Sequence, residues 1–129
     1  MSYVSAAALA LTLAFYGAFA TAAQAQEATE GERLFRQRCA TCHAIEAGQS
    51  RAGPHLDGLI GRRAGSVEGA RYSRAVQESG ITWDEASLDN FLANPRKAVA
   101  GTTMMIGVPN ADQRTAIIAY LKSLPAGAN

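Results

Sequence analysis

The clearest periodic pattern of apolar residues lies near the C-terminus of the chain. The apolar positions there are Ile117, Ile118, Tyr120, Leu121 and Leu124. Their spacing places them on one face of a helix, so we expect an amphipathic helix in this segment. Asn110 is a suitable residue for its start, and Pro125 and Gly127 should end it.

Two earlier segments carry helix start signals. Thr29-Glu30-Gly31-Glu32 has the form of a capping box, in which side-chain oxygens accept the first free backbone N–H groups, and it predicts a helix over about 30–40. Thr82-Trp83-Asp84-Glu85 repeats this form and predicts a helix that Asn94-Pro95 should stop. A further short helix is expected over 72–79. The apolar residues that support the first two are Leu34, Phe35, Leu88, Phe91 and Leu92.

Between these helices the pattern predicts loops. Glycine recurs from Gly48 to Gly69 and no period of 3.6 or 2 survives there, so this segment should be a long loop, as should 95–109. Long loops in compact domains are usually functional, which suits segments wrapped around a ligand. With no strand pattern, the sequence predicts an all-α domain of four or five helices joined by two long loops.

The N-terminal 25 residues form a separate segment. They are rich in Ala, Leu and Phe, and the first charged residue is Glu27. Ala23-Gln24-Ala25 is an A-x-A site of the kind that a signal peptidase cuts. We therefore expect a signal peptide over 1–25 and one domain over 26–129. A basic start is missing, and about 20 apolar residues could also cross a bilayer, so a retained anchor is the alternative.

Charge and composition exclude some classes of function. The chain has 12 basic and 11 acidic residues, all after the expected signal, and a net charge of +1. It is 48% hydrophobic and 18% charged, as soluble globular domains are. Neither nucleic acid nor a strongly charged membrane is indicated as a partner.

The two cysteines of the chain lie in one motif, Cys39-Ala40-Thr41-Cys42-His43. C-x-x-C-H is the attachment motif of c-type haem, in which two thiols form thioethers with the vinyl groups and the histidine lies below the iron. Alternatives are a disulfide or thioredoxin-like redox pair, and a zinc site that would need a fourth ligand such as His55. The thioredoxin-like pair lacks its βαβ context, and the zinc site lacks the usual ligand spacing.

Taken together with this motif, an ordered set of segments resembles the class I cytochromes c. The segments are Gly31-Glu32-Arg33-Leu34-Phe35, Cys39 to His43, Gly53-Pro54, Gly58-Leu59-Ile60-Gly61-Arg62, Tyr72-Ser73, Gly80-Ile81-Thr82-Trp83, Asn94-Pro95, Gly101-Thr102-Thr103-Met104 and Ala119-Tyr120-Leu121-Lys122. The resemblance implies that family's fold, with helices and loops wrapped around a single covalently bound haem.

The resemblance also implies roles for individual residues. His43 would be the proximal iron ligand, with its second ring nitrogen held by the Pro54 carbonyl, and Met104 the distal ligand. Met105 is adjacent to Met104, and spacing alone does not exclude it. His55 is expected to be an exposed loop residue.

Further positions resemble those that bind the haem propionates, namely Arg62, Tyr72, Trp83 and Thr102. Two carboxylates partly withdrawn from water need hydrogen-bond donors. The alternatives are core packing for Trp83, polar surface for Tyr72 and Thr102, and a solvated charge for Arg62. Residues that resemble the contact between the first and last helices are Gly31, Phe35, Ile117 and Tyr120.

The chain departs from the family pattern around Met104. Ala100, Thr103 and Ile106 replace a proline, a lysine and an aromatic residue, which predicts a looser loop. Phe91 replaces a tyrosine that bonds toward the methionine sulfur. The usual ring of lysines is reduced to Lys97 and Lys122.

The sequence therefore predicts a monomeric, periplasmic, monohaem c-type cytochrome that carries single electrons and is not an enzyme. Its donor would be a quinol-oxidising complex or a dehydrogenase, and its acceptor an oxidase, a reductase or a reaction centre. The main alternative is a haem subunit bound stably to a periplasmic dehydrogenase. A third reading is a haem that opens its methionine side to a small ligand or peroxide.

Overall fold

The computed structural model describes residues 7–124, with side chains described from Ala23 onward, and these residues form five helices. They are α1 (Ala7–Arg38), α2 (Arg74–Glu78), α3 (Glu85–Ala93), α4 (Pro95–Ala98) and α5 (Ala111–Ser123). Within residues 7–124 there is no strand, only an isolated bridge between Arg63 and Thr82. The predicted all-α domain with long loops is confirmed.

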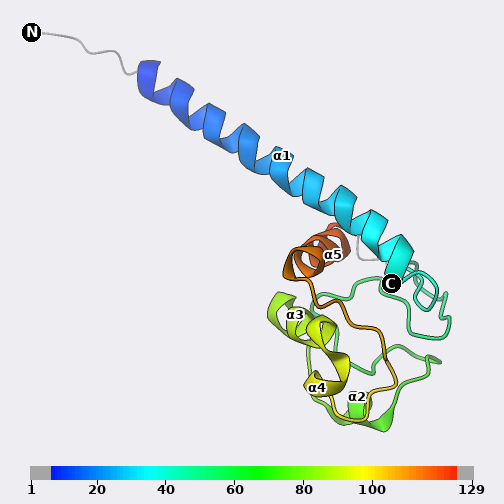
Figure 1. The fold of residues 1–129 in the computed structure, drawn as a ribbon. Helices are drawn as coiled ribbons and strands as arrows, with labels where there is room; N and C mark the ends of the chain where they lie inside the picture. The colour runs from blue at the N-terminus through cyan, green and yellow to red at the C-terminus, as the bar shows by residue number, and fades with distance from the viewer. Residues whose placement is uncertain (1–6, 125–129) are drawn as a thin grey trace, which may run out of the picture.

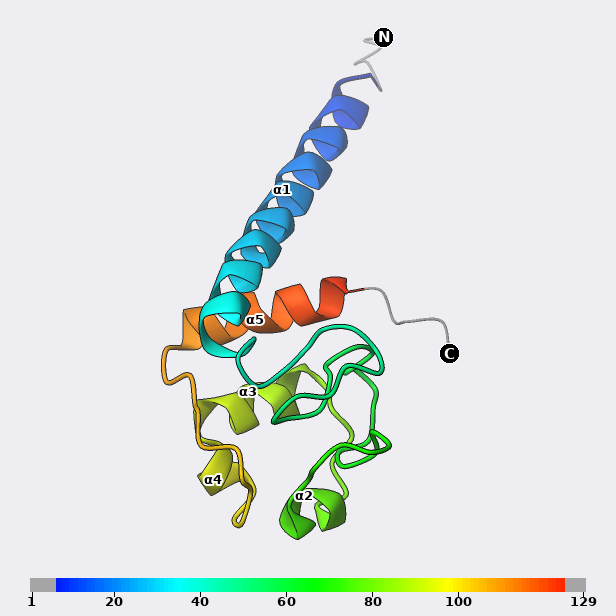
Figure 2. The ribbon, with the colours of Figure 1, turned by 90° about the vertical axis from the view of Figure 1, so that its right-hand side faces the viewer.

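Helix α1 is much longer than the sequence predicts. It runs unbroken through the expected signal peptide, apart from residues 1–6 outside the described range, and its N-terminal half projects away from the rest of the chain (Figures 1 and 2). The helix start that we predicted from the capping box at Thr29 is therefore wrong. The Thr29 hydroxyl lies inside the helix and donates to the Ala25 carbonyl at 2.9 Å, because alanine-rich sequence continues the helix on its N-terminal side.

Two further helix boundaries differ from expectation. Asp84, not Thr82, caps α3, since its carboxylate accepts from Ser87 N at 2.7 Å while the Ser87 hydroxyl accepts from Asp84 N at 2.9 Å. Pro95 begins the short α4 after ending α3, because its fixed φ and missing N–H suit the first turn of a helix. The predicted start of α5 at Asn110 is confirmed, whereas Pro125 and Gly127 lie outside the described residues.

The core forms where α1 and α5 cross. Leu34 and Ile117 are 2% and 1% exposed there, and the rings of Phe35 and Tyr120 lie 5.7 Å apart. A Cβ at Gly31 would overlap the Ala116 carbonyl, so only glycine lets the two backbones approach this closely. The predicted contact between the first and last helices is thus present, and it places the residues after Arg38 beside the core.

No helix in the described part of the chain has both the length and the apolar character needed to cross a membrane.

Candidate functional site

The two thiols and the imidazole of the motif follow directly on the end of α1. The backbone N–H of Cys39 bonds Phe35 O at 2.8 Å, and that of His43 bonds Cys39 O at 2.9 Å, so the motif continues the helical winding. This brings Cys39, Cys42 and His43 to one side of the chain. Both cysteines are free, so the structure contains no disulfide here. Burial raises the pKa of Cys39 to about 11, so its thiol is protonated at neutral pH.

His43 is held by the loop that follows it. Its Nδ1 lies 2.8 Å from the carbonyl oxygen of Pro54, and the backbone N–H of Gly53 bonds Cys42 O at 2.8 Å. A Cβ at Gly53 would overlap the imidazole, so the glycine is what allows the loop to close on the ring.

Electrostatics decide the protonation state of this ring. Burial lowers the pKa of His43, the hydrogen bond to Pro54 opposes that shift, and the charge of Arg62 adds to it. A neutral imidazole that donates from Nδ1 to Pro54 keeps its Nε2 lone pair free. Such an arrangement is typical of a metal-ligating histidine, whose second nitrogen is fixed by a backbone carbonyl.

A cavity of about 380 Å³ lies beside this ring. Every site residue predicted from the sequence contributes to its wall: Cys39, Cys42, His43, Pro54, Arg62, Tyr72, Trp83, Thr102 and Met104. The remainder of the wall is mainly apolar and comes from the core, including Leu59, Val76, Leu88, Leu92, Ile117 and Leu121. The sequence analysis did not identify these residues as cavity residues, because apolar positions such as Leu88 and Ile117 have the spacing of any core residue.

Arg62 forms a cationic part of this wall. Its terminal nitrogens donate to the carbonyls of Asp57 at 2.6 Å and His55 at 2.8 Å, whereas its buried Nε has no partner among the described residues. Burial lowers its pKa, and the neighbouring Tyr72 and Asp57 oppose that shift. A half-buried guanidinium whose buried Nε has a free donor suits a carboxylate from a bound group. The solvated-charge alternative for Arg62 does not match this burial.

The other polar wall residues differ in their surroundings. Trp83 is buried with its ring edge on Phe91, at a centroid distance of 5.1 Å. Thr102 is buried rather than on the surface, and its hydroxyl accepts from Met104 N at 3.2 Å. The Tyr72 hydroxyl oxygen accepts a hydrogen bond from Val67 N at 3.4 Å, so its O–H group can donate to another acceptor.

The two adjacent methionines differ in how much of each side chain is exposed to solvent. Met104 is half-buried against the core, whereas Met105 is 63% exposed, although both contribute to the cavity wall. The burial therefore favours Met104 as the thioether that faces a bound group.

His55 does not lie where the sequence suggested. It is half-buried rather than exposed, and its buried Nδ1 has no hydrogen-bond partner among the described residues. Within the described residues, no three His, Cys, Asp or Glu side chains are arranged so that they could hold a metal ion, so the geometry does not support the zinc alternative.

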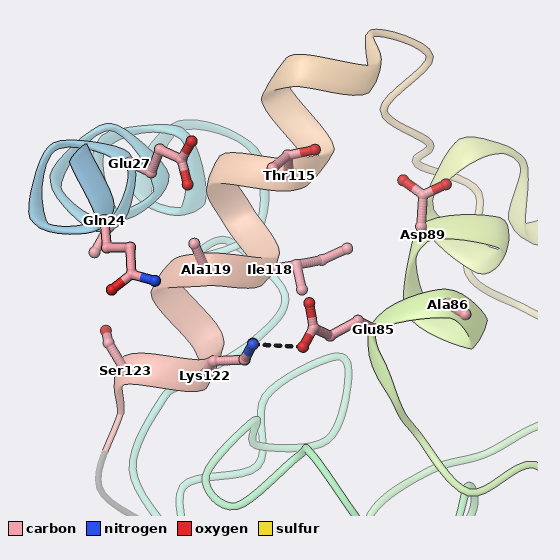
Figure 3. Close-up of a pocket in the computed structure, with 11 residues that line it drawn as sticks. Gln24, Glu27, Glu85, Ala86, Asp89, Thr115, Ile118, Ala119, Lys122 and Ser123 are labelled. Atoms are coloured by element: carbon pink, nitrogen blue, oxygen red, sulfur yellow. Dashed lines mark hydrogen bonds and ion pairs between the residues drawn. The ribbon is translucent and has the colours of Figure 1, made fainter. Parts of the chain in front are cut away.

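A second, larger space of about 790 Å³ is an open groove between α1, α3 and α5 (Figure 3). Gln24 and Glu27 line one side, and Glu85, which pairs with Lys122, lines the other. Among the described residues that line this groove there is no cysteine, histidine or methionine, and the groove adjoins the expected cleavage site. It is therefore not the candidate site.

Comparison with known proteins agrees with this geometry. The family model described as Cytochrome c matches residues 28–125. The chain is 39% identical over 106 residues to a cytochrome c of Guizotia abyssinica, covering 81% of this chain and 96% of that one. It is 42% identical over 100 residues to the cytochrome c-type cyt cy of Rhodobacter capsulatus, covering 77% of this chain and 50% of that one. The solved structure of cytochrome cH from Methylobacterium extorquens matches with a TM-score of 0.69 and 41% identity, covering 74% of this chain and 97% of that one.

Proposed function

Since this chain belongs to the cytochrome c family, whose members carry electrons and hold one covalently bound haem c, we propose that it is a diffusible one-electron carrier of the periplasm. Its fold is the class I cytochrome c fold. The observation that carries the proposal is one cavity that combines both cysteines, the anchored His43 and Met104.

Four residues would hold the cofactor. Cys39 and Cys42 would form the two thioethers, and His43 would ligate the iron through Nε2 while Pro54 holds its Nδ1. Met104 would be the distal ligand, and a soft thioether favours the reduced metal. When bound, the haem supplies a one-electron couple at its iron.

The remaining wall residues would bind the propionates and keep water out. Arg62 offers its unpaired Nε, and Tyr72 and Thr102 offer hydroxyls at the same cavity. Trp83 packs against Phe91, and with a haem in place the apolar wall around them would keep water out of most of the cavity. A dry, rigid surrounding needs little rearrangement when charge changes, which suits rapid electron exchange.

The mouth of the cavity would be the docking surface for redox partners. Met105 and Ile106 are 63% and 55% exposed there, and the exposed Arg38 and Arg71 contribute to the same wall, in which no described residue is acidic. A small apolar contact with a basic rim suits brief encounters with a partner that carries acidic groups. The donor would be a quinol-oxidising complex or a dehydrogenase, and the acceptor an oxidase, a reductase or a reaction centre.

The N-terminal segment would direct export, after which it is either cleaved off as a signal peptide or kept as a membrane anchor. We assign residues 1–25 to a signal peptide, supported by the A-x-A site and by the absence of charge before Glu27 in the sequence. The mass of the exported protein tests this assignment. A chain that begins at Gln26 supports it, and a chain that keeps residues 1–25 would indicate an anchor instead.

The absorption spectrum of the exported protein, oxidised and reduced, tests the proposed function. We expect a low-spin spectrum with the far-red band of iron–thioether ligation, and haem that stays attached after denaturation and extraction. Loss of all haem on extraction would disprove covalent attachment. Co-purification with one large dehydrogenase, rather than elution as a free monomer, would replace the diffusible carrier by a stably bound subunit.

A further inference from the structure

Arg114 is an α5 residue that makes more hydrogen bonds than the sequence suggests. Its side chain is 11% exposed. Its Nε donates to one carboxylate oxygen of Asp89 at 2.6 Å and its Nη2 to the other at 3.4 Å. Its Nη1 donates to the carbonyls of Val108 at 3.1 Å and Pro109 at 2.8 Å. One guanidinium therefore joins three segments: α3, α5 and the end of the preceding loop.

That loop is the one that carries Met104. On its N-terminal side, Thr102 N bonds Val99 O at 3.1 Å, and Met104 N bonds the Thr102 hydroxyl at 3.2 Å. On its C-terminal side, Val108 N bonds Leu92 O at 2.7 Å. Between these points, within the described chain, no backbone hydrogen bond involves residues 105–107. Backbone hydrogen bonds therefore hold this loop only near its two ends.

The Arg114 contacts are of the kind that are costly to break. Val108 is buried, and a buried carbonyl left without its donor costs more than an exposed one, whereas Pro109 is exposed and the Asp89 side chain is 46% exposed. The Arg114 side chain itself is only 11% exposed, and a charge-assisted fork is stronger than a neutral hydrogen bond. The Glu85–Lys122 pair also joins α3 to α5 (Figure 3), but its side chains are 63% and 45% exposed, and it reaches no carbonyl of the loop. Exposed pairs of this kind contribute little.

We infer that Arg114 is a positioning residue that holds the Met104 loop closed, and so sets how readily the methionine side of the haem opens to an added ligand. The inference rests on the proposed function in one respect, because it takes Met104 as the distal ligand. It explains how a loop that lacks the proline, lysine and aromatic residue of its relatives can keep one path.

Carbon monoxide binding to the reduced, haem-loaded protein is the test. Arg114→Gln removes the fork, and Lys122→Gln is the matched control that breaks the other α3–α5 pair. We expect Arg114→Gln to raise the affinity for carbon monoxide at least ~10-fold, equivalent to about 1.4 kcal/mol, with a weaker far-red band. The control should stay within roughly twofold of the parent, as expected for an exposed pair.

A measurement that does not involve the haem separates positioning from general loss of stability. In Arg114→Gln the amide hydrogen of Val108 should exchange faster, whereas that of Thr102, at the other end of the loop, should be unchanged. Arg114→Lys keeps the charge but not the fork, and it gives the same comparison if the glutamine variant does not accumulate.

Equal carbon monoxide affinities in the Arg114 variants and the Lys122→Gln control would overturn this inference and leave the proposed function intact. If the parent protein lacks the far-red band of ligation by a methionine sulfur, both this inference and the proposed function are overturned.

Discussion

The carbonyl oxygen of Pro54 lies 2.8 Å from Nδ1 of His43, and the residue before that carbonyl is a glycine whose missing side chain leaves room for the imidazole ring. The Gly53-Pro54 pair therefore does two jobs. Gly53 allows the loop to approach, and Pro54 supplies the acceptor that fixes the tautomer of the ring.

Replacing Gly53 by alanine should turn the imidazole and alter the haem spectrum, because the added Cβ would overlap the ring. Absorption and circular dichroism in the Soret region measure this change. Gly61→Ala is the matched control, since Gly61 has φ +83° but open space around its Cβ position. Both variants should lose stability, but only Gly53→Ala should change the spectrum. An identical spectrum in the two would mean that Gly53 does not set the ring position.

Met104→Ala should abolish the far-red band and lower the reduction potential, within the roughly 0.8 V range over which axial ligands tune haem. Met105→Ala should leave both unchanged, because that side chain is 63% exposed. Redox titration followed by absorption measures both properties. The reverse result would assign the ligand to Met105.

Gly31→Ala should destabilise the crossing of α1 and α5. Alanine favours a helix by ~1 kcal/mol over glycine, but the obstacle here is the rigid Ala116 backbone, and overpacking costs about 1–3 kcal/mol or more. We expect the melting temperature to fall by about 4–8 °C for each kcal/mol lost. Thermal unfolding followed by circular dichroism measures the change, and an unchanged or raised melting temperature would contradict the close crossing.

Ser87→Ala should lower the melting temperature by an amount that depends on pH. Hydrogen bonds from the backbone and the hydroxyl of Ser87 hold the pKa of Asp84 below its ordinary value of 3.8. The carboxylate therefore adds stability above that value, and this contribution disappears as the pH falls through the lower folded-state pKa. The difference between Ser87→Ala and the parent should thus be larger at pH 7 than at pH 3.

Ser66→Ala is the control for this prediction, because the Ser66 hydroxyl donates to the Arg63 carbonyl and to no carboxylate. Its effect on the melting temperature should be the same at both pH values. A pH-independent difference for Ser87→Ala as well would exclude the proposed link to Asp84.

Local signals predicted the parts of this protein that depend on neighbours in sequence. The cysteine and histidine motif needs only five consecutive residues, and the Asn110 start of α5 depends on its own side chain, which accepts from Gln113 N at 3.0 Å. The same reasoning was wrong at Thr29, whose hydroxyl bonds back to Ala25 because the preceding alanine-rich segment is itself helical. A capping signal is used only where the chain before it is not in a helix.

The sequence by itself determined the all-α class, the haem attachment motif and the residues that gather around one cavity. Only the tertiary structure decided which of two adjacent methionines is half-buried against the core, and that His55 is half-buried rather than exposed. It also showed that Arg114 reaches Asp89, which is 25 positions away, and two carbonyls of the Met104 loop. The reason is physical: burial and long-range hydrogen bonds depend on which segments contact one another in the fold, and local sequence patterns do not show which distant segments do so.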